Sequence, residues 1–587
     1  MSTLRSLSLG ISAVLSVGAA YLLFPATADS ATVRAAAEEP SDFERIPPVV
    51  EDIHITATGQ DPDANALLQL TYAKGQDLPA ELSFNVGDKP VLLKRDDKDP
   101  QLYTATIGFD FDGFVKEQEQ RQKLAEQKAT VPLFDGREFL GEETVQFLEP
   151  NKLREQIASR VAIRIPGVVL PWPSLAVRPE RSLMVTDPLV VEDPIRTFDA
   201  CTNTGNPNGA WTFNRLMTNM ANQPLTGVDP SDFVENWMRT WGTSTTINTF
   251  PVPARSPVIT QVLNTWPRLS TGKLDLTRSP MRLLAIVNRV DLRTNTAYGG
   301  GSAGEGRFVF GVIRRSSTGT CTVHRFTVIL EYGVPISTCP AVRSYAQQWG
   351  NLGTLVLGSP TYNASLQAIT DQFTNANAAP NKPNRSAINQ IRTNEFLQNP
   401  WELREFNIVR GNTQLSIVPA KQTPHHTHNN TALLANYINT NQAQILAGTY
   451  SVPLSYLGTP FLTGSVLNPS PQQVWRAPGI VNNNARNKFS LNTCDACHGR
   501  ETLTTSFLHV APRASGAQAA LSRFLLGNGT LAAPTTFTMA DPIVAATPRT
   551  YGDLLRRQGD LSTLQSSLCR TSGVFQEANF QPLLATD

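Results

Sequence analysis

The N-terminal part of the chain alternates hydrophobic and polar residues, the pattern of strands with one buried face. Turn-forming Gly, Asp and Pro separate the alternating runs. The clearest runs are Ile53–Ala57, Leu68–Tyr72 and Tyr103–Ile107. Together they predict a β-sandwich over residues 45–164, with a charged helix near residues 114–128 inserted in it or appended to it.

Residues 196–480 mix helix and strand patterns. Asp229 precedes a helical pattern with acidic residues in its first turn. Continuous apolar runs predict buried strands at residues 283–287, 308–313 and 321–335, and residues 364–375 and 431–447 have helical periodicity. We predict a central α+β domain here, joined to the sandwich by a proline-rich linker over residues 165–195.

The first residues have the organisation of a secretory signal peptide. Arg5 precedes an apolar run, Leu9–Phe24, and Ala26-Thr27-Ala28 follows as a cleavage sequence. We therefore expect residues 1–28 to be removed and the protein to be periplasmic or secreted. An uncleaved anchor is the alternative, although the run is shorter than the ~20 residues that span a membrane. No later apolar run is long enough, so we expect no membrane span in the mature chain.

Composition removes several classes of protein. The 587 residues are 41% hydrophobic and 17% charged, which is enough apolar material for a folded core. Lys and Arg number 50 against 49 Asp and Glu. This balance argues against a nucleic-acid binder, whose surface carries a basic excess, and against attachment to anionic lipid by a polybasic surface.

The strongest motif is Cys494-Asp495-Ala496-Cys497-His498. This spacing is that of covalent haem attachment: two thiols on one side of a helical turn reach the porphyrin edge, and the histidine binds the iron. Two other interpretations remain open. Cys494 and Cys497 could form a disulfide or a thioredoxin-like redox pair, or they could bind zinc with His498 and a fourth ligand such as His509.

Residues 481–587 resemble a c-type cytochrome domain. Phe489 and Gly499 flank the motif as in F-x-x-x-x-C-x-x-C-H-G, and a helical pattern at residues 551–564 follows Met539. The resemblance implies covalent haem c and a mainly helical segment. It offers Met539 as the sixth iron ligand; His509 or an open position are the alternatives.

The whole chain is also similar to a group of large secreted proteins of Gram-negative bacteria that carry one such segment near the C-terminus. That group has no settled activity. The residues that carry the likeness are 196–201, 209–213, 401–406 and 494–502.

The remaining cysteines predict two disulfides. Cys321 and Cys339 are 18 residues apart and bracket a strand and a turn, so we pair them across a hairpin. Cys201 is then left to pair with Cys569. A disulfide between Cys494 and Cys497 would keep the count even as well, so parity does not decide between them.

These patterns predict a multi-domain α+β protein with an N-terminal β-sandwich, a central mixed α/β body and a C-terminal, mainly helical, cytochrome c-like segment. The expected role is one-electron transfer through haem c with a redox partner that the sequence does not identify. A haem-dependent oxidase or peroxidase with its substrate on the central domain is the second hypothesis. The third is a secreted binding or structural protein whose motif is a disulfide or zinc site. The sequence leaves the oligomeric state open.

Overall fold

A computed structural model describes residues 50–57, 65–72, 80–86, 89–108, 130–135, 138–144, 163–166, 174–294, 302–315, 320–468, 474–504 and 506–566. The chain divides into two compact units. The first is Met1–Val177 with Leu561–Val574, and the second is Arg178–Asp560 with Phe575–Asp587. The predicted signal peptide, the predicted helix near residues 114–128 and Cys569 lie outside the described residues.

The first unit contains a seven-stranded antiparallel sheet in the order β8-β1-β2-β5-β4-β3-β9, and a separate pair, β6–β7. Its strands are β1 Val50–Ala57, β2 Asn65–Tyr72, β3 Glu81–Val86, β4 Lys89–Arg95, β5 Leu102–Gly108, β6 Thr130–Asp135, β7 Glu138–Thr144, β8 Ile163–Pro166 and β9 Ser174–Leu175. The predicted strands at residues 53–57, 68–72 and 103–107 are confirmed as parts of β1, β2 and β5.

The alternation that predicted these strands is visible in their burial. Leu68, Leu70 and Tyr72 of β2 are buried, whereas Gln69 and Thr71 between them are only partly covered. The described strands form one large sheet and one hairpin, not the two packed sheets of a sandwich. A period of two residues shows that one face is covered but carries no information about what covers it.

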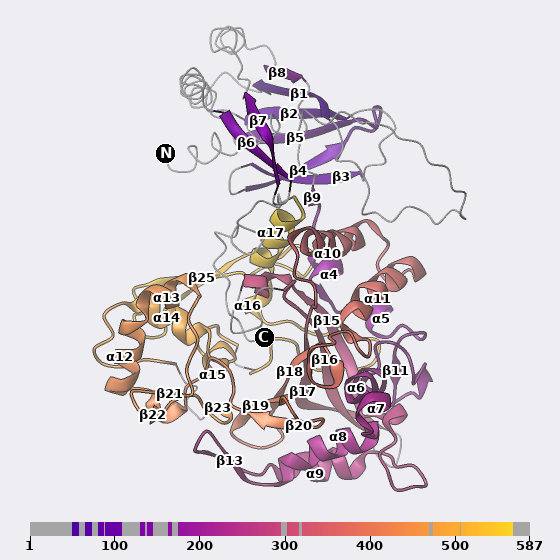
Figure 1. The fold of residues 1–587 in the computed structure, drawn as a ribbon, viewed down its shortest axis with the longest axis vertical. Coiled ribbons are helices and arrows are strands. Elements are labelled where there is room, and N and C mark those ends of the chain that lie inside the picture. The colour runs from indigo at the N-terminus through magenta and orange to yellow at the C-terminus, as the bar shows by residue number, and fades with distance from the viewer. Residues whose placement is uncertain are drawn as a thin grey trace. The chain divides into compact units, whose positions relative to one another are not determined.

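The second unit is a mixed α/β body around one large antiparallel sheet (Figure 1), in the order β10-β15-β16-β17-β18-β19-β20, with β23 also pairing with β19. The strands are β10 Met184–Val185, β15 Met281–Arg289, β16 Glu305–Arg315, β17 Cys321–Gly333, β18 Ile388–Glu395, β19 Trp401–Ile408, β20 Leu415–Val418 and β23 Val466–Asn468. The three strands predicted from apolar runs are confirmed as β15, β16 and β17.

Helices and small hairpins surround this sheet. The helices are α4 Pro179–Ser182, α5 Pro188–Val191, α6 Phe213–Ala221, α7 Gln223–Thr226, α8 Pro230–Arg239, α9 Ser256–Gln261, α10 Cys339–Asn351, α11 Pro360–Thr374, α12 Ala432–Thr440, α13 Gln442–Ala447, α14 Asn483–Leu491, α15 Cys494–Cys497, α16 Arg523–Leu526 and α17 Asp553–Ser566. The hairpins pair β11 Phe198–Asp199 with β12 Thr204–Gly205, β13 Thr245–Ile247 with β14 Phe250–Val252, β21 Ser455–Tyr456 with β22 Thr459–Pro460, and β24 Phe537–Ala540 with β25 Pro548–Tyr551.

One face of the central sheet, which we call the apolar face, carries Phe308, Phe310 and Phe406. Helices α6, α8 and α11 cover it through three ring contacts: Phe213 with Phe310, Trp237 with Phe406, and Phe373 with Phe308. Helix α8 begins as predicted, because the Asp229 carboxylate accepts hydrogen bonds from the backbone N–H groups of Ser231 and Asp232.

The opposite face, which we call the polar face, carries Glu305, Arg307, Glu331, Arg392 and Glu405. These residues alternate with the aromatic ones along the strands, yet they are 0–1% exposed. The segment from residue 494 to residue 513 covers this face. Its Arg513 guanidinium donates to the Leu283 carbonyl of β15 at 2.8 Å. The central sheet is therefore buried on both sides.

The predicted fold class is wrong for the C-terminal region. Ahead of α17, the described residues after 480 form the nine-residue α14, two four-residue helices and a hairpin, joined by long irregular stretches. Phe489 of α14 and Ala496 of α15 belong to a core shared with Tyr437, Phe461 and other residues of the 434–475 region. A mainly helical cytochrome fold needs a core of its own, whereas this region completes the core of the central body.

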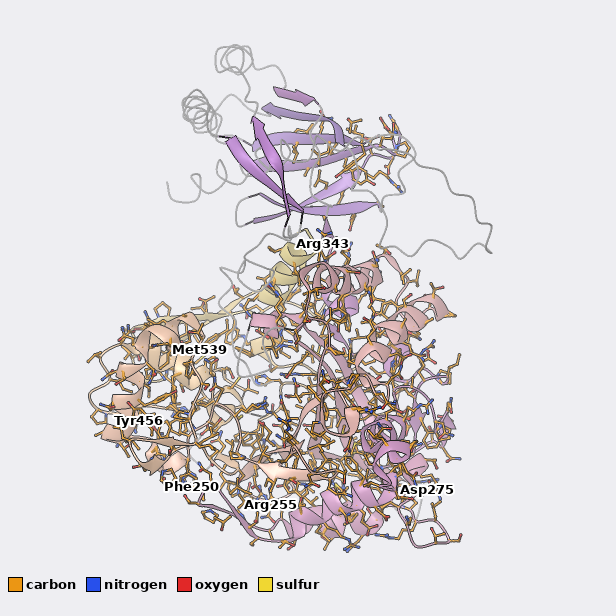
Figure 2. The ribbon with its side chains drawn as sticks, in the orientation of Figure 1. Phe250, Arg255, Asp275, Arg343, Tyr456 and Met539 are labelled. Atoms are coloured by element: carbon orange, nitrogen blue, oxygen red, sulfur yellow. A yellow bond between two sulfur atoms is a disulfide. The ribbon has the colours of Figure 1, made fainter. Side chains whose placement is uncertain are left out.

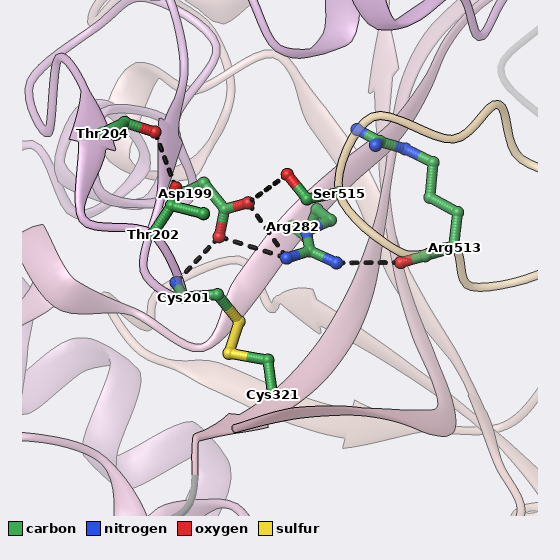
Figure 3. Close-up of a disulfide and its surroundings, with 8 residues drawn as sticks. All are labelled: Asp199, Cys201, Thr202, Thr204, Arg282, Cys321, Arg513 and Ser515. Atoms are coloured by element: carbon green, nitrogen blue, oxygen red, sulfur yellow. Dashed lines mark hydrogen bonds and ion pairs between the residues drawn. A yellow bond between two sulfur atoms is a disulfide. The ribbon is translucent and has the colours of Figure 1, made fainter. Parts of the chain in front are cut away.

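The disulfide pairing also differs from the prediction, because Cys201 is bonded to Cys321, with their Cα atoms 5.9 Å apart (Figure 3). Cys321 is the first residue of β17, and Cys339 begins α10 beyond the far end of that 13-residue strand. A strand of that length spans roughly 40 Å at about 3.3 Å per residue. The sequence spacing suggested a short hairpin, but the long strand brings Cys321 to the β11–β12 hairpin instead.

Candidate functional site

The Cys-x-x-Cys-His motif lies on the short helical turn that its spacing predicts. Helix α14 ends at Leu491, and α15 spans Cys494–Cys497, with His498 as its C-cap. The two cysteines are three positions apart on one turn, so they lie on the same side of the helix. Both are free thiols and both are fully buried.

His498 is held from two sides. Its Nδ1–H donates to the Phe507 carbonyl at 2.9 Å, which fixes the orientation of the ring. The ring stacks against Trp401 of β19, with centroids 5.4 Å apart and planes 25° apart. The side chain is 1% exposed. The histidine of the motif is therefore packed directly onto the central sheet.

His509 completes a group that we call the thiol–imidazole cluster, formed by Cys494, Cys497, His498 and His509. The Cys497 Sγ lies 3.5 Å from His509 Nε2, and His509 Nδ1 is hydrogen-bonded to the Ser522 hydroxyl at 2.8 Å. When the thiol donates to Nε2, the neutral imidazole carries its proton on Nδ1 and donates it to the Ser522 hydroxyl. A thiol, an imidazole and an orienting hydroxyl are the components of an activated sulfur nucleophile.

The two cysteines lie in different environments. Cys494 packs in an apolar group with Trp401, Leu403, Ala420 and Val466, and burial raises its pKa to about 11. Its thiol therefore stays protonated at neutral pH. Cys497 instead has an imidazole within reach of its sulfur. The same turn thus holds one unreactive thiol and one thiol with a neighbouring base.

Asp495 lies between the two cysteines and is 1% exposed. Its Oδ1 accepts from the Trp475 indole N–H at 2.9 Å and from the Ala496 backbone N–H at 3.0 Å. Burial nevertheless dominates and raises the pKa of this carboxyl to about 6. The motif therefore includes a carboxyl group that titrates close to neutrality.

A small cavity of about 20 Å³ lies beside His498 and His509, between them and residues of β10, β15, β16, β17 and β18. By the same measure a water molecule needs at least about 10–15 Å³, so this space suits a water-sized molecule. Polar and apolar side chains of both layers line it: Met184, Val287, Arg307, Val309, Thr327, Ile329, Asn394, His498, His509 and Val510.

Paired charges extend across the polar face beside this cavity. Four contacts link neighbouring side chains: Arg307 to Glu305 at 2.8 Å, Arg307 to Glu331 at 3.5 Å, Arg392 to Glu331 at 3.6 Å and Arg392 to Glu405 at 3.0 Å. We call this row the ion-pair ladder. Burial and the negative charge of Glu305 raise the pKa of Glu331, although the two arginines oppose the shift. Pairing is what allows so many charges to be buried.

Met539, the predicted sixth ligand, is not brought to the cluster. It lies in β24 (Figure 2), where it pairs with Arg549 of β25. Arg549 donates to Asn483 and Asn484 at the start of α14. Met539 does not line the cavity beside His498, whereas Met184 of β10 does. His509, the alternative ligand, is the residue that the fold places beside the motif.

The two histidines are not arranged to hold a haem between them. The rings of His498 and His509 have centroids 4.5 Å apart and touch directly, so no porphyrin lies between them. Trp401 occupies another side of His498, and the adjoining space is water-sized. The donor set matches the haem motif, but the direct contact of the two imidazoles excludes a haem ligated by both histidines in this arrangement.

Within the part of the chain that the structure describes, no three His, Cys, Asp or Glu side chains are placed to hold a metal ion. No described helix is both long and apolar enough to cross a membrane. Sequence reasoning identified every member of the cluster but missed Ser522, which reaches His509 beside a single β-bridge between Val510 and Leu521.

No family model, curated protein or solved structure matches this chain.

Proposed function

We propose that this protein is a thiol-based redox protein that cycles Cys494 and Cys497 between dithiol and disulfide. The observation that carries the proposal is the contact of the Cys497 sulfur with His509, itself held by Ser522. An adjacent base raises the thiolate fraction of a cysteine, and the thiolate is its reactive form. A dithiol–disulfide cycle also requires a second thiol close to the first, and Cys494 on the same helical turn supplies it.

The two thiols take different roles in such a reaction. His509 accepts the proton of Cys497, and the thiolate attacks a sulfur of an external disulfide, releasing one thiolate and forming a mixed disulfide. The first external thiolate takes the proton held by His509. Cys494 then attacks the Cys497 sulfur, and its proton passes to the second external thiolate, which leaves as a thiol. Two electrons pass to the external disulfide. The high pKa of Cys494 keeps this thiol protonated, so Cys497 is the thiol that attacks first.

Export remains part of this proposal. The Cys201–Cys321 disulfide supports it, because such bonds persist mainly in oxidising compartments. The one-electron haem carrier that the motif predicts is the competing proposal. It is supported by the spacing of Cys494, Cys497 and His498 and by the flanking Phe489 and Gly499.

The test is the reactivity of each cysteine in the native protein. Treatment with a maleimide is continued long enough for the native protein to open locally, and the labelled cysteines are identified by peptide mass mapping. We expect Cys497 to react faster than Cys494. His509→Gln should slow Cys497 by at least about tenfold at neutral pH, because the base is lost. Ser522→Ala should slow it less, since it only frees the ring to turn.

His428→Gln is the matched control, because that histidine is also largely buried but bonds to the Pro460 carbonyl, and it should leave the rate unchanged. Equal reactivity of the two cysteines, unaffected by His509→Gln, would show that the pair is structural. Haem that stays on the denatured chain, and is lost in Cys494→Ala with Cys497→Ala, would establish the haem carrier instead.

A further inference from the structure

The thiol–imidazole cluster is closed to any partner in this structure. Its four side chains are 0–2% exposed, so a disulfide substrate cannot reach Cys497. The residues from 506 to 522, which we call the cover segment, carry His509 and lie over the polar face. Exchange chemistry at Cys497 requires this segment to move, and the question is what holds it down.

Side chains from outside the cover segment fasten its middle. The Arg282 guanidinium of β15 donates to the Arg513 carbonyl at 2.9 Å, and the Ser515 hydroxyl donates to Asp199 Oδ2 at 3.0 Å (Figure 3). Glu192 accepts from the Arg513 guanidinium and from the Gly516 backbone N–H. The segment is thus held by the sheet, by the loop after α5 and by the β11–β12 hairpin.

Asp199 connects these attachments. Its carboxylate pairs with Arg282 at 2.9 Å and accepts from the Cys201 backbone N–H at 2.7 Å, in addition to Ser515. Arg282 is 5% exposed, so this ion pair is poorly screened by solvent. One carboxylate therefore joins the β11–β12 hairpin, the sheet and the cover segment.

The hairpin that carries Asp199 has a covalent tie to the sheet. Its two strands are two residues each, and residues 202–206 beyond Cys201 are exposed. The Cys201–Cys321 disulfide joins it to β17. Both cysteines are only half-buried, so a reductant reaches this bond more readily than it reaches the closed cluster.

We propose that the Cys201–Cys321 disulfide is a redox-sensitive latch on the cover segment, a regulation that rests on the proposed function of the cluster. A dithiol reductant transfers two electrons and two protons to this bond, giving two thiols while the reductant becomes a disulfide. The freed hairpin withdraws Asp199 from Arg282 and Ser515. The cover segment then opens locally, and Cys497 becomes reactive.

The test compares the full-length protein with the latch closed and open. We expect Cys201→Ser with Cys321→Ser to raise the maleimide labelling rate of Cys497 by about tenfold or more without reductant, as local opening exposes it. Brief treatment of wild type with a dithiol, followed by its removal, should give the same rate. Asp199→Asn should give an intermediate increase with the disulfide intact.

Thr202→Ala is the control, because it removes a hydrogen bond to Thr204 within the same hairpin and leaves Asp199 untouched. Hydrogen exchange of residues 509–522 is measured in parallel and should rise with the labelling rate. Unchanged exchange and labelling, both in reduced wild type and in Asp199→Asn, would overturn the latch. If exchange rises while Cys497 stays unreactive, the latch stands and the proposed thiol chemistry fails.

Discussion

Within the motif, Asp495 is a carboxyl group whose pKa is raised by folding. An unfolded aspartate has a pKa near 3.9, and burial raises the pKa of Asp495 to about 6 in the folded protein. Between these values the folded state binds more protons than the unfolded state, so this carboxyl lowers stability as the pH rises through the window. Above pH ~6 the ionised carboxyl lowers the free energy of unfolding by its full amount, about 3 kcal/mol at most.

Asp495→Asn should therefore stabilise the protein in a pH-dependent way. The amide keeps an oxygen for the Trp475 indole but never ionises. We expect the variant and wild type to have similar free energies of unfolding near pH ~4, and the variant to gain up to about 3 kcal/mol by pH ~7.5. Denaturant titrations at the two pH values measure the difference in free energy of unfolding between the variant and wild type. A gain that is equal at both would mean that ionisation of Asp495 is not its cause.

At this scale the sequence predicted most of the candidate site. Cys494, Cys497 and His498 fall within one helical turn, so their spacing alone places them together. His509 was identified as a competing ligand and does lie at the cluster. The sequence could not decide between Met539 and His509 as the ligand. Distance along the chain does not show how a hairpin such as β24–β25 folds back.

Strand β18 shows what an element contributes beyond its own residues. Arg392 at its centre pairs with Glu405 of β19 and Glu331 of β17, and it is fully buried. Removing the cation leaves two carboxylates without it in the sheet interior, which typically costs about 3–5 kcal/mol for a buried pair. The ion-pair ladder is thus most sensitive where one arginine serves two acids.

Arg392→Met should destabilise the protein by about 3–5 kcal/mol for this reason. The matched variant is Arg239→Met, which breaks an ion pair with Glu235 on the surface of α8, where the arginine side chain is 61% exposed. We expect a loss of about 0.3–0.5 kcal/mol there. Denaturant unfolding of both measures the difference, and equal losses would show that the ladder adds no more than a surface pair.

The strands of the central sheet show what a hydrophobic pattern predicts about an element and what it does not. Apolar runs correctly predicted β15, β16 and β17. The pattern also shows Glu305 and Arg307 alternating with Phe308 and Phe310, which usually means one face in water. Here the charged face is buried, because the cover segment, far along the chain, lies on it. A local pattern cannot report a cover supplied from elsewhere in the sequence.

At the scale of the whole molecule, the Cys201–Cys321 disulfide closes a loop of 120 residues in sequence separation. Such a loop restricts the unfolded chain strongly, and bonds of this kind typically contribute about 2–5 kcal/mol. We expect Cys201→Ser with Cys321→Ser to lower the free energy of unfolding by that amount. Oxidised and reduced wild type, compared by denaturant titration, should differ similarly. No difference would mean that the unfolded chain is already compact.

Long-range facts of this kind were beyond the sequence. The number of sheets in the first unit, the partner of Cys321 and the shared core of residues 434–496 all depend on which segments meet in space. The sequence predicted a linker over residues 165–195, and the first compact unit includes Met1–Val177 while the second begins at Arg178. Helical and strand periods are local quantities, whereas these features are not.

The ion-pair ladder also bears on how the chain assembles. A protein emerges N-terminus first, so strands β15 to β19 are complete before the cover segment appears. An apolar sheet face left open in that interval would invite association with other nascent chains. A face of ion-paired acids and arginines stays hydrated during that interval. When the cover segment packs onto this face it displaces that water, so burial of the ladder depends on a part of the chain that is made last.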